Sequence, residues 1–168
     1  YESAMVWKLH LKLKAQLEAR GFEVMTTRVN IDTNLGVYER GTASKGCDVF
    51  LSLHSNACGT ESVDYPVVYR AYDNKNNVDT LALKIAKKVG ELMGTAKAGR
   101  TATRKNSSGG EYYGVLRGAR AVGTPYYMLI EHSFHTNTKA TKWLSKDANL
   151  DKLAVAEADI LAEFFGME

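Results

Sequence analysis

The chain has 168 residues, 45% hydrophobic and 24% charged, with a net charge of +3. That length is enough to bury one core without disulfides or metals as staples. The mild charge argues against a nucleic-acid-binding protein, and no apolar run approaches the roughly 20 residues of a membrane span. Charges also interrupt the start too early for a signal peptide. We therefore expect a single domain over residues 1–168, monomeric and without membrane insertion.

The first half of the chain alternates helical and strand patterns. Over residues 2–20 the apolar side chains recur at helical spacing, and Gly21 is placed to end that helix. The β-prone segment 22–28 predicts a strand, and residues 35–45 predict a second helix. Segment 47–54 is continuously apolar, as in a strand covered on both faces.

A further strand is predicted over residues 62–72, where Pro66 favours an edge position. Cys47 and Cys58 flank the preceding strand, and an extended segment of that length spans more than about 30 Å. We therefore expect both cysteines to be free thiols.

The second half continues the alternation. The sequence predicts a helix over 76–93, a long Gly-, Ser-, Lys- and Arg-rich loop over 95–110, strands over 112–118 and 125–134, and closing helices over 136–145 and 150–165. Strands that alternate with helices predict an α/β fold with a mostly parallel, mixed sheet and helices on both faces.

Candidate functional residues stand where strands end, because sites in open α/β sheets gather outside the carboxyl ends of the strands. One strand ends at His54, and another ends at Glu131 and His132. Each candidate has an ordinary interpretation by itself. His54 suits a hydrogen-bonded loop position, Glu131 a carboxylate paired with an arginine such as Arg117, and Glu2 an exposed acid at a helix N-terminus. Together they are the parts of a catalytic zinc site, with a His and a Glu ligand and a second Glu as base.

Four motifs in a fixed order extend this hypothesis. The first motif is Glu2 at the start of the first helix, followed by "ARGFEV" and Thr27-Arg28. The other three are "GVYERGTASKGCD", "SLHSNA" and "IEHSFHTN". In this order and spacing the sequence resembles the zinc-dependent N-acetylmuramoyl-L-alanine amidases. These are cell-wall hydrolases found among spore enzymes, autolysins and phage lysis enzymes (endolysins). The resemblance covers nearly the whole chain.

The resemblance implies a role for each matching residue. Glu2 and His54 would bind Zn²⁺, Glu131 would act as general base without being a primary ligand, and Asn56 would shape the pocket. The implied substrate is peptidoglycan, cleaved by zinc-activated water at the amide between the lactyl group of N-acetylmuramic acid and L-alanine. The implied location is the cell wall, outside the cell.

The chain departs from the family pattern at one ligand. The family's first zinc ligand is a histidine that ends an initial strand, and both would lie upstream of Tyr1. We expect that strand to exist, giving a sheet of about six strands, because a neighbouring strand would otherwise be left unpaired. The alternative is that His132 or His135 replaces the ligand. His132 should point away from Glu131, so His135 is the better stand-in. Ser133 also replaces the usual glycine.

Basic residues precede the last strand, and they suggest a role in substrate binding. Arg104 and Arg117 could bind the carboxylates of stem peptides in bidentate fashion, or belong to an ordinary solvated loop. Two other functions stay open. One is a zinc peptidase with a different amide substrate, and the other is a non-catalytic wall-binding module.

Overall fold

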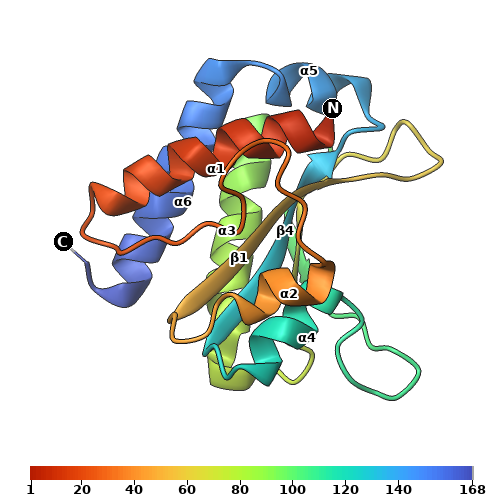
Figure 1. Ribbon diagram of the computed structural model, residues 1–168. Coiled ribbons are helices and arrows are strands. Elements are labelled where there is room, and N and C mark those ends of the chain that lie inside the picture. The colour runs from red at the N-terminus through yellow and green to blue at the C-terminus, as the bar shows by residue number, and fades with distance from the viewer. Residues whose placement is uncertain (168) are drawn as a thin grey trace.

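The computed structural model describes residues 1–167, and its centre is one mixed sheet of four strands in the order β1-β4-β2-β3 (Figure 1). β1 (Val49–Asn56) runs parallel to β4 (Tyr126–Phe134). β2 (Val67–Arg70) is antiparallel to β4 and parallel to β3 (Arg100–Ala102). The α/β class is thus confirmed, with β4 as a central strand.

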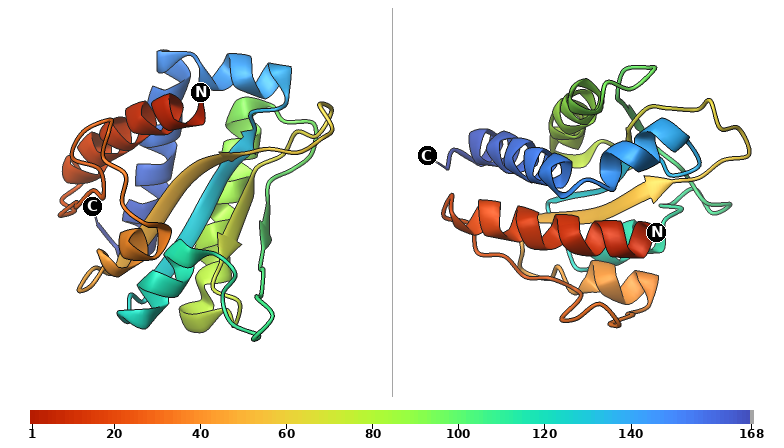
Figure 2. Two further views of the ribbon diagram at one scale, coloured as in Figure 1. Left: turned by 45° about the vertical axis from the view of Figure 1, so that its right-hand side comes forward. Right: turned by 90° about the horizontal axis from the view of Figure 1, so that it is seen from above.

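Helices cover both faces of this sheet. They are α1 (Glu2–Glu18), α2 (Val37–Thr42), α3 (Val78–Met93), α4 (Gly114–Ala121), α5 (Thr138–Leu144) and α6 (Asp147–Phe165), with a 3₁₀ turn, η1 (Lys75–Asn77), before α3. Figure 2 shows α3 and α6 on one side of the sheet and α2 on the other, where α2 packs against α4. α1 packs against α6 and contacts β1.

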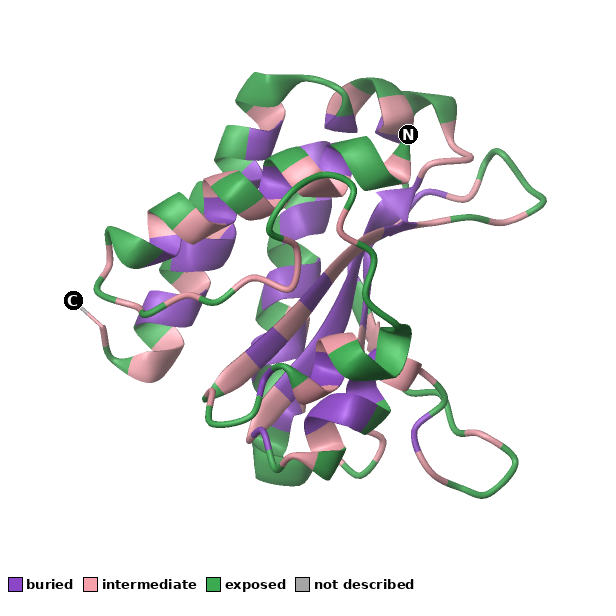
Figure 3. Ribbon diagram, viewed as in Figure 1, coloured by how far each residue is buried: buried purple, intermediate pink, exposed green. Residues whose placement is uncertain are grey.

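The core follows from the apolar pattern of the central elements. Every residue of β4 from Tyr127 to Phe134 is buried, because helices cover both faces of that strand (Figure 3). The apolar stripe of α1 is buried as its spacing predicts: Met5, Leu9, Leu13 and Leu17. This packing fixes the first turn of α1, which carries Glu2, near the end of β1.

The expected count of about six strands is not matched, because the sheet formed by residues 1–167 has four. Residues 22–28 form no strand, although Phe22 and Val24 pack against the core. Within residues 1–167 that segment has no neighbouring strand to complete a ladder, and β1 is an outer strand of the sheet. A β-prone sequence becomes a strand only where backbone partners exist.

Two further strand predictions are corrected. Segment 112–118 leads into helix α4, because Val115, Leu116 and Ala119 are buried at helical spacing. A seven-residue window is too short to distinguish the two periods. β2 is an inner strand and not an edge strand. It begins directly after Pro66, so the missing N–H of the proline falls outside the strand, while the Pro66 carbonyl accepts the Arg100 N–H. The long loop predicted over 95–110 contains the short strand β3.

The helices α2 and α4 cross at two glycines. A Cβ on Gly118 would lie 2.2 Å from the Tyr38 carbonyl oxygen, and one on Gly41 would lie 2.0 Å from the Val115 carbonyl oxygen. Backbone atoms at both points leave no space for a methyl group. Glycine is therefore required for this close approach, which packs α4 beside β4.

We predict that Gly118→Ala destabilises the fold by at least about 2 kcal/mol. Alanine in an exposed helix would gain about 1 kcal/mol over glycine, but here the methyl group would push α2 away from α4. Urea unfolding measures the change. Gly59→Ala is the matched control, because a Cβ there meets nothing within 4 Å. An unchanged midpoint for Gly118→Ala would contradict the close approach.

Candidate active site

The parallel pairing of β1 with β4 sets His54 directly beside Glu131. Both residues lie toward the carboxyl ends of their strands, and the register shifts between His54 and Asn56, where the regular ladder ends. The first turn of α1 brings Glu2 to the same place. Three residues that are far apart in sequence therefore share one edge of the sheet.

Glu2 contacts His54 directly. Its Oε1 lies 2.9 Å from His54 Nδ1 and accepts the Ser55 N–H at 3.1 Å. Burial by itself would raise the pKa of Glu2, but the hydrogen bonds from His54 and Ser55 and the electrostatic attraction of the His54 and His135 rings outweigh it. The pKa of Glu2 is therefore lowered, and the carboxylate is ionised at neutral pH.

The His54 ring has a partner at each nitrogen. Ser52 Oγ lies 2.9 Å from Nε2, on the side opposite the Glu2 contact. A carboxylate can only accept, so in neutral His54 the Nδ1–H donates to Glu2 and the Nε2 lone pair accepts from the Ser52 hydroxyl. Both partners hold the ring in one orientation.

Glu131 is a buried carboxyl group with an unsatisfied oxygen. The residue is 9% exposed, and its Oε2 has no hydrogen-bond partner among the described residues. Burial, and then the negative charge of Glu2, raise its pKa to about 7, against a smaller opposing effect of His54 and His132. A carboxyl group with a pKa near neutrality in a buried site is suited to proton transfer.

The described residues fit a zinc ion in part. Two ligands of a tetrahedral zinc ion, each at about 2.0–2.1 Å from it, stand about 3.3 Å apart. The observed 2.9 Å between Glu2 Oε1 and His54 Nδ1 needs only a small opening to match that distance. A cation there would also compensate the neighbouring Glu131. However, no group of three or more His, Cys, Asp and Glu residues within 1–167 is arranged to hold a metal ion.

His135 and Asn56 border this edge without completing a ligand set. His135 Nδ1 lies 2.8 Å from the Ser55 carbonyl oxygen and 3.1 Å from Ser55 Oγ, so this nitrogen is already engaged. The electrostatic attraction of the His135 ring helps to lower the pKa of Glu2. The Asn56 carbonyl accepts the His135 N–H, and the Asn56 side chain accepts the Ala57 N–H.

Arg104 and Arg117 lie away from the residues described above. β3 runs antiparallel to β4 through β2, so the chain beyond β3 travels toward the amino end of β4, away from Glu131. In Figure 1 the loop that follows β3 lies at the end of the sheet remote from the N-terminus. The Arg117 guanidinium donates to the carbonyls of Glu111 and Tyr112, and Arg104 stacks on the Tyr112 ring. Arg117 is therefore no partner of Glu131.

Sequence reasoning missed a buried pair next to Glu131. His132 Nε2 lies 2.6 Å from Glu157 Oε1, and its Nδ1 lies 2.9 Å from the His54 carbonyl oxygen. Burial would lower the pKa of His132, but Glu157 and the His54 carbonyl outweigh it and the pKa is raised. A signal existed, because Glu157 interrupts the apolar stripe of α6: Leu150, Leu153, Ala154, Ala158 and Leu161.

Ser133 adopts a left-handed backbone conformation, with φ at +59°. Its hydroxyl donates to the buried Asp64 at 2.8 Å, and Asp64 also accepts the Ala96 N–H. Such a φ is unfavourable for a residue with a Cβ, and the Asp64 hydrogen bond helps to retain it. It ends the regular alternation of β4 just after Glu131. The sequence shows the serine but not its backbone conformation.

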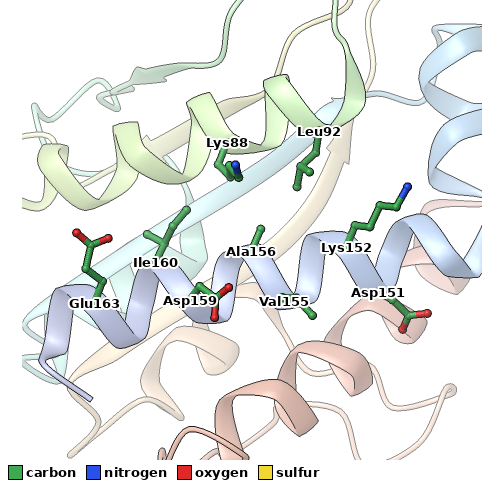
Figure 4. Close-up of a pocket in the computed structure, with 9 residues that line it drawn as sticks. All are labelled: Lys88, Leu92, Asp151, Lys152, Val155, Ala156, Asp159, Ile160 and Glu163. Atoms are coloured by element: carbon green, nitrogen blue, oxygen red, sulfur yellow. The ribbon is translucent and has the colours of Figure 1, made fainter. Parts of the chain in front are cut away.

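A surface groove between α3 and α6 is separate from this edge (Figure 4). It is lined by Lys88, Leu92, Asp151, Lys152, Val155, Ala156, Asp159, Ile160 and Glu163. None of the residues described above borders it.

Cys47 and Cys58 are free, as predicted. No helix within residues 1–167 is long and apolar enough to cross a bilayer.

Comparisons with known proteins give one consistent result. The sequence model of a family described as N-acetylmuramoyl-L-alanine amidase matches residues 1–163. A comparison of the sequence with curated proteins finds no match.

Solved structures share the fold. Cwp6 from Clostridium difficile superposes with a TM-score of 0.83 at 23% identity, over 96% of this chain and 25% of that chain, so this chain spans about a quarter of Cwp6. The catalytic domain of CwlV, an N-acetylmuramoyl-L-alanine amidase from Bacillus (Paenibacillus) polymyxa var. colistinus, gives 0.80 at 21% identity, over 100% and 87%. The N-acetylmuramoyl-L-alanine amidase AmiC2 of Nostoc punctiforme gives 0.78 at 20%, over 98% and 84%. At these identities the likeness establishes the fold.

We predict that Glu131→Gln stabilises the metal-free protein at pH 8 but not at pH 4. The pKa of Glu131 is about 7 in the folded state against an ordinary 4.5. The folded state therefore holds its proton more tightly than the unfolded state, and stability falls as pH rises from about 4.5 to about 7. Glutamine removes this loss, for a gain of up to about 3 kcal/mol at pH 8.

Urea unfolding in the presence of a chelator at the two pH values measures this difference. Glu23→Gln, at an exposed position, is the control and should change stability at neither pH. Equal stability of wild type and Glu131→Gln at pH 8 would show that the carboxylate is not penalised by burial.

Proposed function

Because the chain belongs to the N-acetylmuramoyl-L-alanine amidase family, we propose that it hydrolyses peptidoglycan with the help of a zinc ion. The bond cleaved is the amide between the lactyl group of N-acetylmuramic acid and the L-alanine of the stem peptide. The observation that carries this proposal is the convergence of Glu2, His54 and Glu131 at one edge of the sheet. An ionised carboxylate, an oriented imidazole and a proton-accepting carboxyl group are the side chains that the reaction needs.

In this proposal Glu2 and His54 hold the zinc ion. When bound, the ion lowers the pKa of a water molecule and polarises the scissile carbonyl. A catalytic site has three protein ligands, and the described residues bring two into contact. The resemblance predicts the third as a histidine upstream of Tyr1, and His135 is the weaker alternative, because its Nδ1 already contacts Ser55. Asn56 shapes the pocket from the end of β1.

Glu131 is the general base. Its carboxylate takes the proton of the attacking water and delivers it to the alanine nitrogen as the carbon–nitrogen bond breaks. The supporting features are its burial, its unsatisfied Oε2 and its pKa of about 7. No lysine or arginine within residues 1–167 lowers the pKa of Glu131, so the carboxyl group keeps affinity for the transferred proton.

Arg104 and Arg117 stay predicted substrate-binding residues. Their position toward the amino end of β4 means that they would contact a part of the substrate remote from the scissile amide. We also propose that the protein works in the cell wall, outside the cell, because peptidoglycan lies there. We propose in addition that it works as a monomer.

Two other functions remain as outcomes of experiment. Analysis of the products from purified peptidoglycan separates an amidase, which frees the amino group of L-alanine, from a zinc peptidase, which frees other termini. Metal analysis separates both enzymes from a non-catalytic wall-binding module, which would bind peptidoglycan without zinc.

We predict that Glu131→Gln retains zinc but loses turnover. Glutamine has similar shape but cannot accept the proton, and general-base catalysis contributes about 10²–10⁴-fold. Metal content and the release of alanine amino groups from peptidoglycan are the two measurements. Glu23→Gln is the control with normal activity. Turnover near the wild-type rate in Glu131→Gln would show that another group is the base.

A second prediction concerns Arg104. If its guanidinium binds substrate carboxylates, Arg104→Glu raises KM for purified peptidoglycan several-fold and leaves kcat nearly unchanged, because the residue lies away from Glu131. Lys45→Glu makes the same change of charge at another exposed position and is the control. An unchanged KM in Arg104→Glu would dismiss this binding role.

A further inference from the structure

We propose that His132 and Glu157 are positioning residues that fix the peptide group between His54 and Ser55, and through it both Glu2 and the His54 ring. The inference rests on the proposed function, because it assigns these two residues a task at the same zinc site. Neither side chain would touch zinc or substrate. Their action is transmitted through the backbone of β1.

The pair is fully enclosed. The side chains of His132 and Glu157 are 0% and 1% exposed, and they join β4 to α6 at 2.6 Å. The other ring nitrogen of His132 reaches across to β1, 2.9 Å from the His54 carbonyl oxygen. One imidazole therefore links two strands and a helix at the end of the β1–β4 ladder.

The hydrogen-bonding chemistry makes this link directional. A carbonyl oxygen only accepts, so His132 Nδ1 carries a proton and donates a hydrogen bond to the His54 carbonyl oxygen. The contact between Nε2 and Glu157 Oε1 contains one further proton, and both hydrogen bonds persist whichever of the two atoms holds it. Glu157 thus fixes the ring orientation that aims Nδ1–H at the His54 carbonyl, as a second partner does for many metal-ligating histidines.

The target peptide group is the one that organises the zinc ligands. Its carbonyl end is held by His132, and its N–H end, from Ser55, donates to Glu2 Oε1 at 3.1 Å. The same peptide unit follows directly from the Cα that carries the His54 imidazole. A rotation of this unit would shift the Glu2 carboxylate and the His54 ring together.

This peptide unit needs support from a side chain. The register between β1 and β4 shifts between His54 and Asn56, so the regular ladder does not continue past it. Two ionisable side chains buried inside a core are costly, and an apolar pair of similar size is often at least as stabilising. Stability alone therefore gives little reason for His132 and Glu157, whereas control of the His54–Ser55 peptide does.

The test compares three variants with the wild type. His132→Leu/Glu157→Leu removes the link and keeps an apolar core, so it should unfold at a similar or higher urea concentration but bind zinc at least tenfold more weakly. Glu157→Gln retains a hydrogen-bond partner for His132 Nε2, because the glutamine amide can donate to its lone pair, and should bind zinc within about threefold of wild type. Leu161→Ala, also buried on α6, should lose stability and keep its zinc affinity, because it leaves both hydrogen-bonding partners of His132 in place.

Zinc affinity is measured by competition with a chromogenic chelator, and turnover on purified peptidoglycan accompanies it. If the double variant is unstable, Glu157→Leu alone is compared with Glu157→Gln. Zinc binding that is weaker in Glu157→Leu but not in Glu157→Gln would support the proposal. Equal affinity in the leucine and glutamine variants, or wild-type affinity in the double variant, would overturn it.

A readout without zinc separates this proposal from the proposed function. In the metal-free protein the amide proton resonance of Ser55 reports its hydrogen bond to Glu2. We expect it to move upfield in the double variant and to stay in place in Glu157→Gln and Leu161→Ala. If the wild type bound no zinc, the proposed function would fail, and this resonance would still decide the positioning role. An unmoved resonance in the double variant would overturn it.

Discussion

The parallel ladder between β1 and β4 is the constraint on which the candidate site depends. It sets His54 beside Glu131, and a shift of one residue would turn one of these side chains to the opposite face. Everything else at the site is arranged around this pairing. The apolar stripe of α1 places Glu2 against it, and α6 reaches it through Glu157 and His132.

The electrostatics of the site follow from two neighbouring carboxyl groups, of which Glu131 is buried and Glu2 is half-buried. Glu2 has hydrogen bonds from His54 and Ser55 that keep it ionised, whereas Glu131 has an unsatisfied oxygen and a pKa of about 7. The two groups thus divide the tasks of ligand and proton acceptor by environment and not by residue type. A cation bound beside Glu2 would offset the negative charge that Glu131 faces.

Two energetically unfavourable features, a left-handed backbone conformation and a buried pair of ionisable side chains, lie near this edge. Ser133 holds a left-handed backbone conformation, and His132 and Glu157 are buried together in the core. Each has a compensating hydrogen bond, from Ser133 to Asp64 and from His132 to the His54 carbonyl. Concentration of such features beside Glu131, while the α1 stripe and most of the core are plainly apolar, is typical of a functional site.

The sequence by itself determined the long helices α1, α3 and α6 and the strands β1 and β4, because their periodicity extends over enough residues to be read locally. It also determined the candidate residues Glu2, His54 and Glu131, through motifs at strand and helix ends. Tertiary structure decided the rest. Residues 22–28 lack a strand partner, residues 114–121 became helix α4 by packing, and the His132–Glu157 pair joins positions 25 apart. Pairing, burial and side-chain partners depend on residues distant in the chain, and no local pattern contains them.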